Sequence, residues 1–131
     1  MDRQKTFMVI DDHDEVVRLV KTILYMEGYT VIWGCSGENA LYVNKMHPSP
    51  IDILLTDVRM ENDRSGCDLA RAMRVLRPEI KVIYMSAFAA DERVAEEVEA
   101  GMAGFIAKPF TAKKLLAKVE EVLADRPQPQ P

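Results

Sequence analysis

The 131-residue chain is predicted to fold as an α/β protein with a doubly wound, five-stranded parallel sheet and five helices. Short apolar runs alternate with segments of helical periodicity along the whole chain. The first, third and fourth runs are almost continuously apolar, which is typical of strands covered on both faces. Each pair of runs is separated by enough residues for a helix, and this favours right-handed crossovers between parallel strands.

The five apolar runs predict five strands, and four of these runs lead directly into a polar residue that can take part in chemistry. These four are followed by Asp11-Asp12, Asp57, Ser86 and Lys108-Pro109. The predicted strands span residues 7–10, 30–33, 51–56, 81–85 and 104–107.

Turn residues and apolar spacing predict the helices that follow the strands. Asp14 is expected to cap the first helix, Gly28 to end it and Thr111 to cap the last one. The remaining helices are predicted over residues 38–46, 67–76 and 91–100. The side chains expected to face the core are Val16, Leu19, Val20, Ile23 and Leu24; Leu69, Ala70, Met73 and Leu76; Val94, Ala95 and Val98; and Leu115, Leu116, Val119, Val122 and Leu123.

Composition and charge narrow the function classes. Apolar residues make up 48% of the chain and charged residues 29%, as in a globular protein. The net charge of −4 argues against a surface that binds nucleic acid. The sequence contains neither a membrane span nor a secretory signal, so we expect a cytoplasmic protein. Cys35 and Cys67 lack the C-x-x-C spacing and are expected to be reduced thiols.

The chain is long enough for one domain, which we place at residues 5–125. Residues 126–131 are rich in Pro and Gln and are expected to be extended and solvated. This tail is typical of the start of a linker.

The polar residues that follow the strands predict a functional site. Ligands of parallel α/β sheets bind beyond the carboxyl ends of the strands. Asp11, Asp12, Asp57, Ser86 and Lys108 are therefore expected to meet at one edge. Crowded carboxylates repel one another, and Mg²⁺, which prefers oxygen ligands, relieves that repulsion. This set of groups can hold Mg²⁺ and a phosphoryl group together.

Each of these residues also has an ordinary structural interpretation when it is taken alone. An Asp-Asp pair is common in solvated turns, a lone Ser is often a helix cap, and a lone Lys is usually a surface charge. Other chemistries are less well supported, because phosphate-binding and dinucleotide-binding glycine loops are absent and Ser86 has no nucleophile elbow around it. His13 and His47 lack metal-ligand spacing and are interpreted as surface residues. A cis peptide bond before Pro109 would suit a turn.

Over about residues 5–125, the chain resembles the receiver (CheY-like) domains of bacterial two-component response regulators. Each motif is weak alone, but their shared order and spacing are specific. The motifs are Asp11-Asp12, Asp57 followed by Met60, Gly66 at the next helix, Ser86-Ala87, Gly101-x-x-Gly104-Phe105 and Lys108-Pro109-Phe110. The resemblance implies a flavodoxin-like (βα)₅ fold.

The resemblance also implies roles for the residues that carry chemistry. Asp57 would accept a phosphoryl group from a phosphohistidine. Asp12 and Asp57 would bind Mg²⁺ directly, Asp11 would act largely through water, and the backbone carbonyl of Arg59 would complete the protein ligands. Lys108 would pair with the phosphoryl group.

The resemblance implies that phosphorylation of Asp57 would change the conformation of the domain through two residues. Ser86 would bond a phosphoryl oxygen and move toward it, and the Phe105 ring would turn into the space that Ser86 leaves. The alternative interpretation of Phe105 is an ordinary core residue. The output surface would comprise the fourth helix, the fifth strand and the fifth helix. The acidic residues Glu92, Glu96, Glu97 and Glu99 of the fourth helix would either form a solvated face or select a partner.

A histidine kinase or histidine phosphotransfer domain would be the phosphoryl donor, and a downstream protein or an output domain outside this chain would receive the signal. We expect neither nucleic-acid nor membrane contact. A homodimer that forms on phosphorylation is compatible with this interpretation. One alternative is an interaction module of the same fold that is never phosphorylated. A second is a phosphatase with an aspartyl-phosphate intermediate, but the chain is short for a cap domain.

The sequence departs from the family pattern near the acceptor. Glu61 stands where Pro is frequent in the family. The loop between Asp57 and Gly66 is one residue longer than in the family pattern. Arg59 and Phe88 occupy positions that in this family flank the hydrolytic water. We expect these two bulky side chains to slow hydrolysis of the phosphorylated form.

Overall fold

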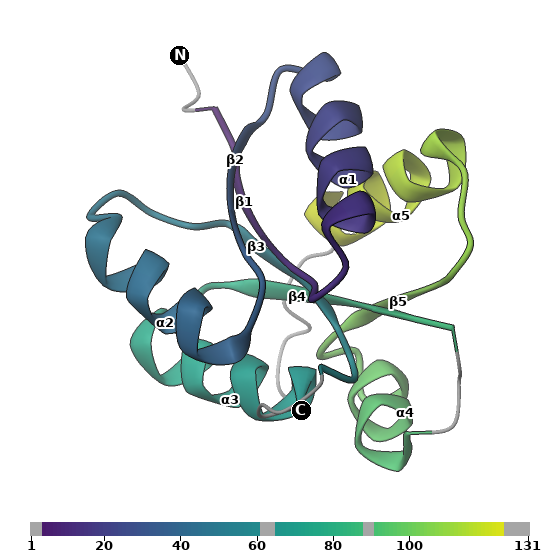
Figure 1. Ribbon diagram of the computed structural model, residues 1–131. Helices are drawn as coiled ribbons and strands as arrows, with labels where there is room; N and C mark the ends of the chain where they lie inside the picture. Colours follow the sequence, from purple (N-terminus) through teal and green to yellow (C-terminus); the bar gives the residue numbers. More distant parts are fainter. Residues whose placement is uncertain (1–3, 61–64, 88–90, 125–131) are drawn as a thin grey trace.

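The computed structural model describes residues 4–60, 65–87 and 91–124, in which five strands alternate with five helices (Figure 1). The predicted fold class is confirmed. The elements are β1 (Thr6–Ile10), α1 (Asp14–Met26), β2 (Thr30–Gly34), α2 (Gly37–Met46), β3 (Ile53–Asp57), α3 (Gly66–Leu76), β4 (Lys81–Ser86), α4 (Glu92–Glu99), β5 (Gly104–Ala107) and α5 (Ala112–Ala124).

The strands form one parallel sheet in the order β2-β1-β3-β4-β5. The order reverses between β1 and β3, and ligands bind at such a point in doubly wound sheets. Ile10 pairs with Thr56, so the residues that follow them, Asp11 and Asp57, leave the sheet side by side. The sheet therefore places two of the predicted carboxylates together without any special loop.

Helices cover both faces of the sheet. Helices α1 and α5 lie on one face, and α2, α3 and α4 lie on the other (Figure 1). Successive strand residues point to opposite faces; Phe7 and Val9 pack toward α1 and α5, whereas Met8 and Ile10 pack toward α2 and α3. This double coverage explains why the sequences of β1, β3 and β4 are almost continuously apolar.

Short polar side chains cap four of the helices. Ser36 Oγ accepts a hydrogen bond from the Asn39 N–H at 3.0 Å, and Ser65 Oγ accepts one from the Asp68 N–H at 3.2 Å. Asp91 caps α4, and Thr111 accepts from the Lys114 N–H at 3.1 Å, as predicted for the last helix. The prediction for α1 is wrong by one residue, because His13 is the N-cap and Asp14 is the first helical residue. The Asp14 carboxylate still lies in the first turn, where the helix dipole favours an anion.

The faces of two helices differ from those predicted. Leu19 is 49% exposed and Leu76 is 55% exposed, whereas Val17 and Cys67 are buried in their helices. The segment that starts at Val16 is apolar at several helical spacings, so periodicity alone could not decide which stripe faces the sheet. Strand β3 also begins at Ile53, two residues later than predicted.

The fourth helix has a buried acidic residue instead of a fully apolar inner face. Ala95 and Val98 are exposed, contrary to prediction, while Val94 and Glu97 are buried. Glu97 is thus not part of a solvated acidic face. Its Oε1 accepts hydrogen bonds from the Tyr84 hydroxyl at 2.7 Å and from an Arg74 N–H at 2.8 Å. The polar partners on β4 and α3 explain how a carboxylate can lie inside this layer.

Across the described ranges, we find no helix that is both long enough and apolar enough to cross a membrane. Cys35 and Cys67 are free cysteines, as predicted; the first is exposed and the second is buried.

Gly66 links the fold to the predicted acceptor. Its N–H donates to the Val58 carbonyl at 2.8 Å, and a Cβ built on Gly66 would lie 2.1 Å from the Asp57 carbonyl oxygen. We expect Gly66→Ala to lower the free energy of unfolding by about 2–3 kcal/mol, because backbone atoms would have to move apart. Urea denaturation measures this change. Alanine is the better helix former, so equal or higher stability would show that the close approach tolerates a methyl group.

Candidate functional site

The site lies where the central strands end. Asp57 is the last residue of β3 and Ser86 the last of β4, while Asp11 and Lys108 immediately follow β1 and β5. Backbone hydrogen bonds extend the strand pairing past these ends: the Val58 N–H donates to the Met85 carbonyl at 3.1 Å, and the Lys108 N–H donates to the Ser86 carbonyl at 2.8 Å. The sheet itself therefore holds these side chains in a row.

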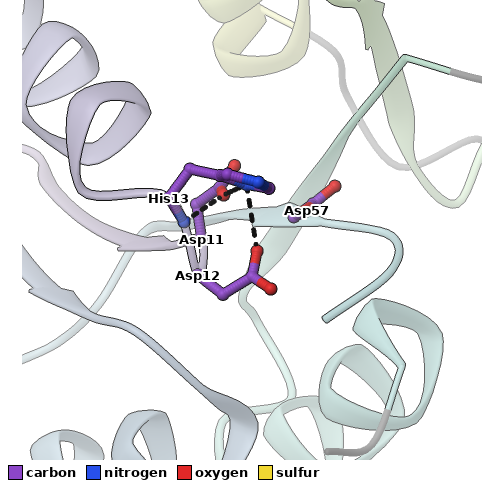
Figure 2. Close-up of side chains that lie close together, drawn as sticks. All are labelled: Asp11, Asp12, His13 and Asp57. Carbon is purple, nitrogen blue, oxygen red and sulfur yellow. Dashed lines mark hydrogen bonds and ion pairs between the residues drawn. The ribbon is translucent and has the colours of Figure 1, made fainter. Parts of the chain in front are cut away.

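Three carboxylates gather at this edge. Asp11, Asp12, His13 and Asp57 each offer a ligand atom, and these atoms lie within 4.8 Å of one another (Figure 2). Asp11 is fully buried and Asp57 is only 6% exposed. The acidic cluster predicted from the strand ends is therefore present in the fold. Carboxylates this close repel one another, more strongly here than in water.

Lys108, which directly follows the edge strand β5, supplies a positive charge to this cluster. Its Nζ lies 2.6 Å from Asp11 Oδ2 and 3.5 Å from Asp57 Oδ1. The Lys108–Pro109 peptide bond is cis, the isomer considered from the sequence. A cation that contacts two carboxylates can also balance the charge of an anion placed between them.

The electrostatics of Asp57 reflect this crowding. Burial raises the pKa of the Asp57 carboxyl above its usual value, and the neighbouring charge of Asp11 raises it further. The Lys108 ammonium opposes these effects, and Asp12 adds a smaller increase. The carboxylate of Asp57 is therefore held in an environment that favours any added positive charge.

His13 is a member of the cluster that the sequence interpretation missed. Its side chain is 59% exposed, as predicted, yet its Nδ1 lies 3.1 Å from Asp11 Oδ1 and 3.1 Å from Asp12 Oδ1 (Figure 2). The His13 N–H also donates to Asp11 Oδ1 at 2.9 Å, which is an Asx turn. The Asp-x-His spacing was the available signal. The hydrogen bond with Asp11, then the charges of Asp12 and Asp11, raise the pKa of His13.

The remaining predicted site residues differ in their setting. Ser86 is buried at the end of β4, whereas Arg59 is exposed two residues after Asp57. Phe105 pairs with Tyr84 in the sheet and is half-buried against the core that faces α3. Phe88 and Glu61 lie outside the described residues, so the expectation about slow hydrolysis stays a prediction.

The carboxylates fit a hard divalent cation. An octahedral ion with Mg–O distances of ~2.1 Å separates its ligand oxygens by roughly 3–4 Å. The ligand atoms offered by the cluster lie within a similar range, up to 4.8 Å. Small side-chain rotations would bring the carboxylate oxygens of Asp11, Asp12 and Asp57 around one ion. Lys108 would remain beside it to face the charge of a bound phosphoryl group.

Comparison with known proteins agrees with this arrangement. Residues 7–120 match the family model described as "Response regulator receiver domain". The chain belongs to the response regulator receiver domain family. This membership identifies the domain as a phosphoacceptor signalling module of two-component systems rather than a true enzyme, and it implies a histidine kinase as partner. The alternative of a phosphatase is therefore not retained. The acidic cluster is typical of the Mg²⁺ site of receivers.

Curated relatives carry the receiver in different protein contexts. The chain is 33% identical over 118 residues to the sensor kinase CckA of Brucella abortus, covering 90% of this chain and 12% of that protein. It is 31% identical over 118 residues to the chemotaxis protein CheY of Pseudomonas aeruginosa, covering 88% of this chain and 93% of that protein. The response regulator SaeR of Staphylococcus epidermidis is 29% identical over 117 residues, covering 89% of this chain and 49% of that protein. This chain thus spans about half or less of two of these three relatives.

Solved structures share the fold. A CheY-like receiver domain protein of Methanospirillum hungatei superimposes with a TM-score of 0.78 at 27% identity, covering 91% of this chain and 93% of that one. The chemotaxis protein CheY4 of Vibrio cholerae superimposes with a TM-score of 0.81 at 22% identity, covering 92% of this chain and 99% of that one. The second likeness is a likeness of fold alone.

The contact between His13 and the carboxylates can be measured by NMR titration. We expect the imidazole of His13 to titrate above its ordinary pKa of 6.5, because Asp11 and Asp12 favour its protonated form. Saturating Mg²⁺ should lower that pKa, since the ion neutralises the same carboxylates. The resonances of His47 serve as an internal reference. A His13 pKa that stays the same when Mg²⁺ is added would contradict the assignment of the cluster as the cation site.

Asp57→Asn should stabilise the fold at neutral pH. A carboxyl whose pKa is raised on folding destabilises the folded state when it ionises, so this contribution to stability falls as the pH rises from 3.8 through the raised pKa. Removing the charge should gain about 1 kcal/mol, or about 3–5 °C in Tm, at pH 7. Calorimetry without Mg²⁺ measures the change, and Mg²⁺ should stabilise the wild type more than the variant.

Asp68→Asn is the matched control for this measurement. Asp68 is an exposed carboxylate whose pKa is lowered, chiefly by the hydrogen bond from Arg93. Its contribution has the opposite sign, because it stabilises the fold above the pKa of the unfolded state. An equal rise in Tm for both variants would indicate a general effect of net charge and not the crowding at Asp57.

Proposed function

We propose that this receiver domain is a phosphorylation-dependent switch of a two-component phosphorelay, in which Asp57 accepts a phosphoryl group from a phosphohistidine. The observation that carries this proposal is the placement of Asp57 between the Asp11-Asp12 pair and Lys108, whose Nζ lies 3.5 Å from its carboxylate. A nucleophilic carboxylate, a cation site and an ammonium are the groups that phosphoryl transfer needs.

The reaction forms one bond and breaks another. A carboxylate oxygen of Asp57 attacks phosphorus in line with the imidazole nitrogen of the donor, and the phosphorus–nitrogen bond breaks. The electron pair leaves with the imidazole, and the product is an acyl phosphate on Asp57. Burial and Asp11 raise the pKa of Asp57, so its carboxylate is more basic than a solvated aspartate and a better nucleophile.

The other residues of the site position and neutralise charge. Asp12 and Asp57 would bind Mg²⁺ directly, with Asp11 acting through water and the Arg59 carbonyl as a further ligand. When bound, Mg²⁺ neutralises charge that develops on the phosphoryl oxygens. Lys108, already held 2.6 Å from Asp11, would pair with the phosphoryl group as it arrives. These roles account for a cluster of carboxylates with a single lysine at the edge of the sheet.

The acyl phosphate would then act on the switch residues. Ser86 would donate its hydroxyl to a phosphoryl oxygen, and Phe105 would turn inward from its half-buried position. Inverting a two-state equilibrium from 1:99 to 99:1 takes ~5.5 kcal/mol, and new charge-assisted contacts from Ser86 and Lys108 are of that order. The face formed by α4, β5 and α5 would carry the change to a partner.

The donor would be a histidine kinase or a histidine phosphotransfer domain, and the receiver of the signal a downstream protein or an output domain attached to this one. We place the domain at residues 5–125 and propose that it works in the cytoplasm, without nucleic-acid or membrane contact of its own. A homodimer through the output face is compatible with this scheme. The alternative is a constitutive interaction module of the same fold, and the complete set of Asp11, Asp12, Asp57, Ser86 and Lys108 favours the switch.

Incubation with acetyl phosphate tests the proposal directly. We expect intact-mass spectrometry to show one added phosphoryl group that requires Mg²⁺, because Asp57 is the only acceptor in the scheme. Asp57→Asn should abolish the adduct. Asp68→Asn, which removes an exposed carboxylate on α3, should leave it unchanged.

Beryllofluoride separates a short-lived adduct from an absent one. This phosphoryl mimic should bind the wild type in the presence of Mg²⁺ even when hydrolysis is too fast for mass spectrometry. A wild-type protein that gains no phosphoryl group and binds no beryllofluoride would support the constitutive interaction module instead.

A further inference from the structure

A polar cluster connects strand β4 with helices α3 and α4. It consists of Arg74 on α3, Tyr84 on β4 and Glu97 on α4, and we call these three residues the α4 clamp. Glu97 Oε1 accepts a hydrogen bond from the Tyr84 hydroxyl at 2.7 Å and from an Arg74 N–H at 2.8 Å. One carboxylate oxygen therefore connects three separate elements.

The contact between Tyr84 and Glu97 is buried, which makes it strong and its loss costly, whereas the Arg74 side chain is 20% exposed. Tyr84 is fully buried and Glu97 is 7% exposed. Burial and the hydrogen bond with Glu97 raise the pKa of Tyr84 far above its usual value, so its hydroxyl keeps its proton and acts as the donor. Hydrogen bonds to a charged group are about twice as strong as neutral ones, and a buried carboxylate left without partners is strongly destabilising.

The clamp is adjacent to the switch residues. Tyr84 lies two residues before Ser86 on β4, so both side chains point to the same face of the sheet. Tyr84 is also the register partner of Phe105 on the neighbouring strand β5. Tyr84 is therefore both the neighbour of Phe105 in the sheet and the residue whose hydroxyl contacts Glu97 on α4.

Arg74 extends the clamp to the segment that leads into β5. The same nitrogen that contacts Glu97 also donates to the carbonyl of Met102 at 3.2 Å. Met102 lies three residues before Phe105 in the chain. A displacement of α4, or of the connection from α4 to β5, relative to α3 would stretch both hydrogen bonds at once.

A second contact between α3 and α4 provides a comparison. Arg93 donates to Asp68 Oδ1 at 2.9 Å and to Ser65 Oγ at 2.7 Å. The Arg93 side chain is 37% exposed and that of Asp68 is 48% exposed. This pair joins the same two helices without touching β4. Solvent-exposed ion pairs contribute little to stability, typically below ~1 kcal/mol.

We propose that Arg74, Tyr84 and Glu97 are positioning residues that hold α4 and the start of β5 in the unphosphorylated arrangement, and so set how readily Asp57 is phosphorylated. This inference rests on the proposed switch function. The clamp joins β4, which ends in Ser86, to the helix and strand of the proposed output face. Contacts present in one state only shift the equilibrium by their own free energy.

The test compares Tyr84→Phe with Arg93→Gln. Tyr84→Phe removes one hydroxyl and keeps the ring in the core. We expect it to bind beryllofluoride with Mg²⁺ about three- to tenfold more tightly by calorimetry, and to react with acetyl phosphate faster by a similar factor. Arg93→Gln removes the exposed contact between the same helices and should change either quantity by less than twofold. Hydrogen exchange of residues 92–99 should quicken in Tyr84→Phe and not in the control.

Glu97→Gln is the second clamp variant, because it keeps the shape of the side chain and removes its charge. It should shift beryllofluoride binding in the same direction as Tyr84→Phe, and it decides the test if Tyr84→Phe does not fold. Unchanged affinity in a folded clamp variant would overturn the proposal, since the clamp would then persist in both states. Weaker binding would overturn it as well, by placing the clamp in the activated arrangement. Failure of the wild type to bind beryllofluoride would count against the switch function itself, which is a different result.

Discussion

Three carboxylates are crowded together at the carboxyl edge of this sheet. Asp11, Asp12 and Asp57 lie within a few ångströms of one another, and Asp11 is fully buried. Lys108 balances part of this charge through its contacts with Asp11 and Asp57. The exposed His13 side chain contacts Asp11 and Asp12. This acidic cluster is typical of the Mg²⁺ site of receiver domains. Burial, and then the neighbouring charge of Asp11, raise the pKa of Asp57, and the same crowding supports the function that we propose.

The parallel sheet makes such crowding possible. Lys108 and Asp11 are 97 residues apart in the chain, yet their side chains are 2.6 Å apart. The strand order places β1 beside β3 and β3 beside β4, so each polar residue leaves the sheet next to the previous one. The start of α3 is packed just as closely, because Gly66 leaves no room for a side chain beside the Asp57 carbonyl. Strand pairing and close packing thus fix the positions of these groups, and preorganised charges are what electrostatic catalysis of phosphoryl transfer requires.

Strand β4 connects the site to the surface of the domain. Its last residue, Ser86, lies at the edge where the phosphoryl group would bind, and Tyr84 reaches from the same face of the strand to Glu97 on α4. Helix α4, whose buried residues are Val94 and Glu97, is thus held in part by a polar contact. Hydrogen bonds weaken steeply as their distance and angle change, so a small displacement of α4 would break this contact.

Much of this protein was predictable from its sequence. The order of the elements, the parallel sheet and the meeting of Asp11, Asp12, Asp57 and Lys108 follow from the apolar periods and from the rule that parallel strands end at one edge. The apolar periods are local properties of the chain, and the edge rule then brings the strand-end residues together although they are distant in sequence. The choice of Val17 over Leu19 for the inner face of α1, the contact of His13 with two carboxylates and the burial of Glu97 depended on the tertiary structure. Glu97 has the sequence environment of a solvated acidic helix, and only Arg74 and Tyr84, brought from α3 and β4, make its burial favourable. Local patterns encode which segments are helix or strand, whereas the partners of a polar side chain are set by elements that are distant in the chain.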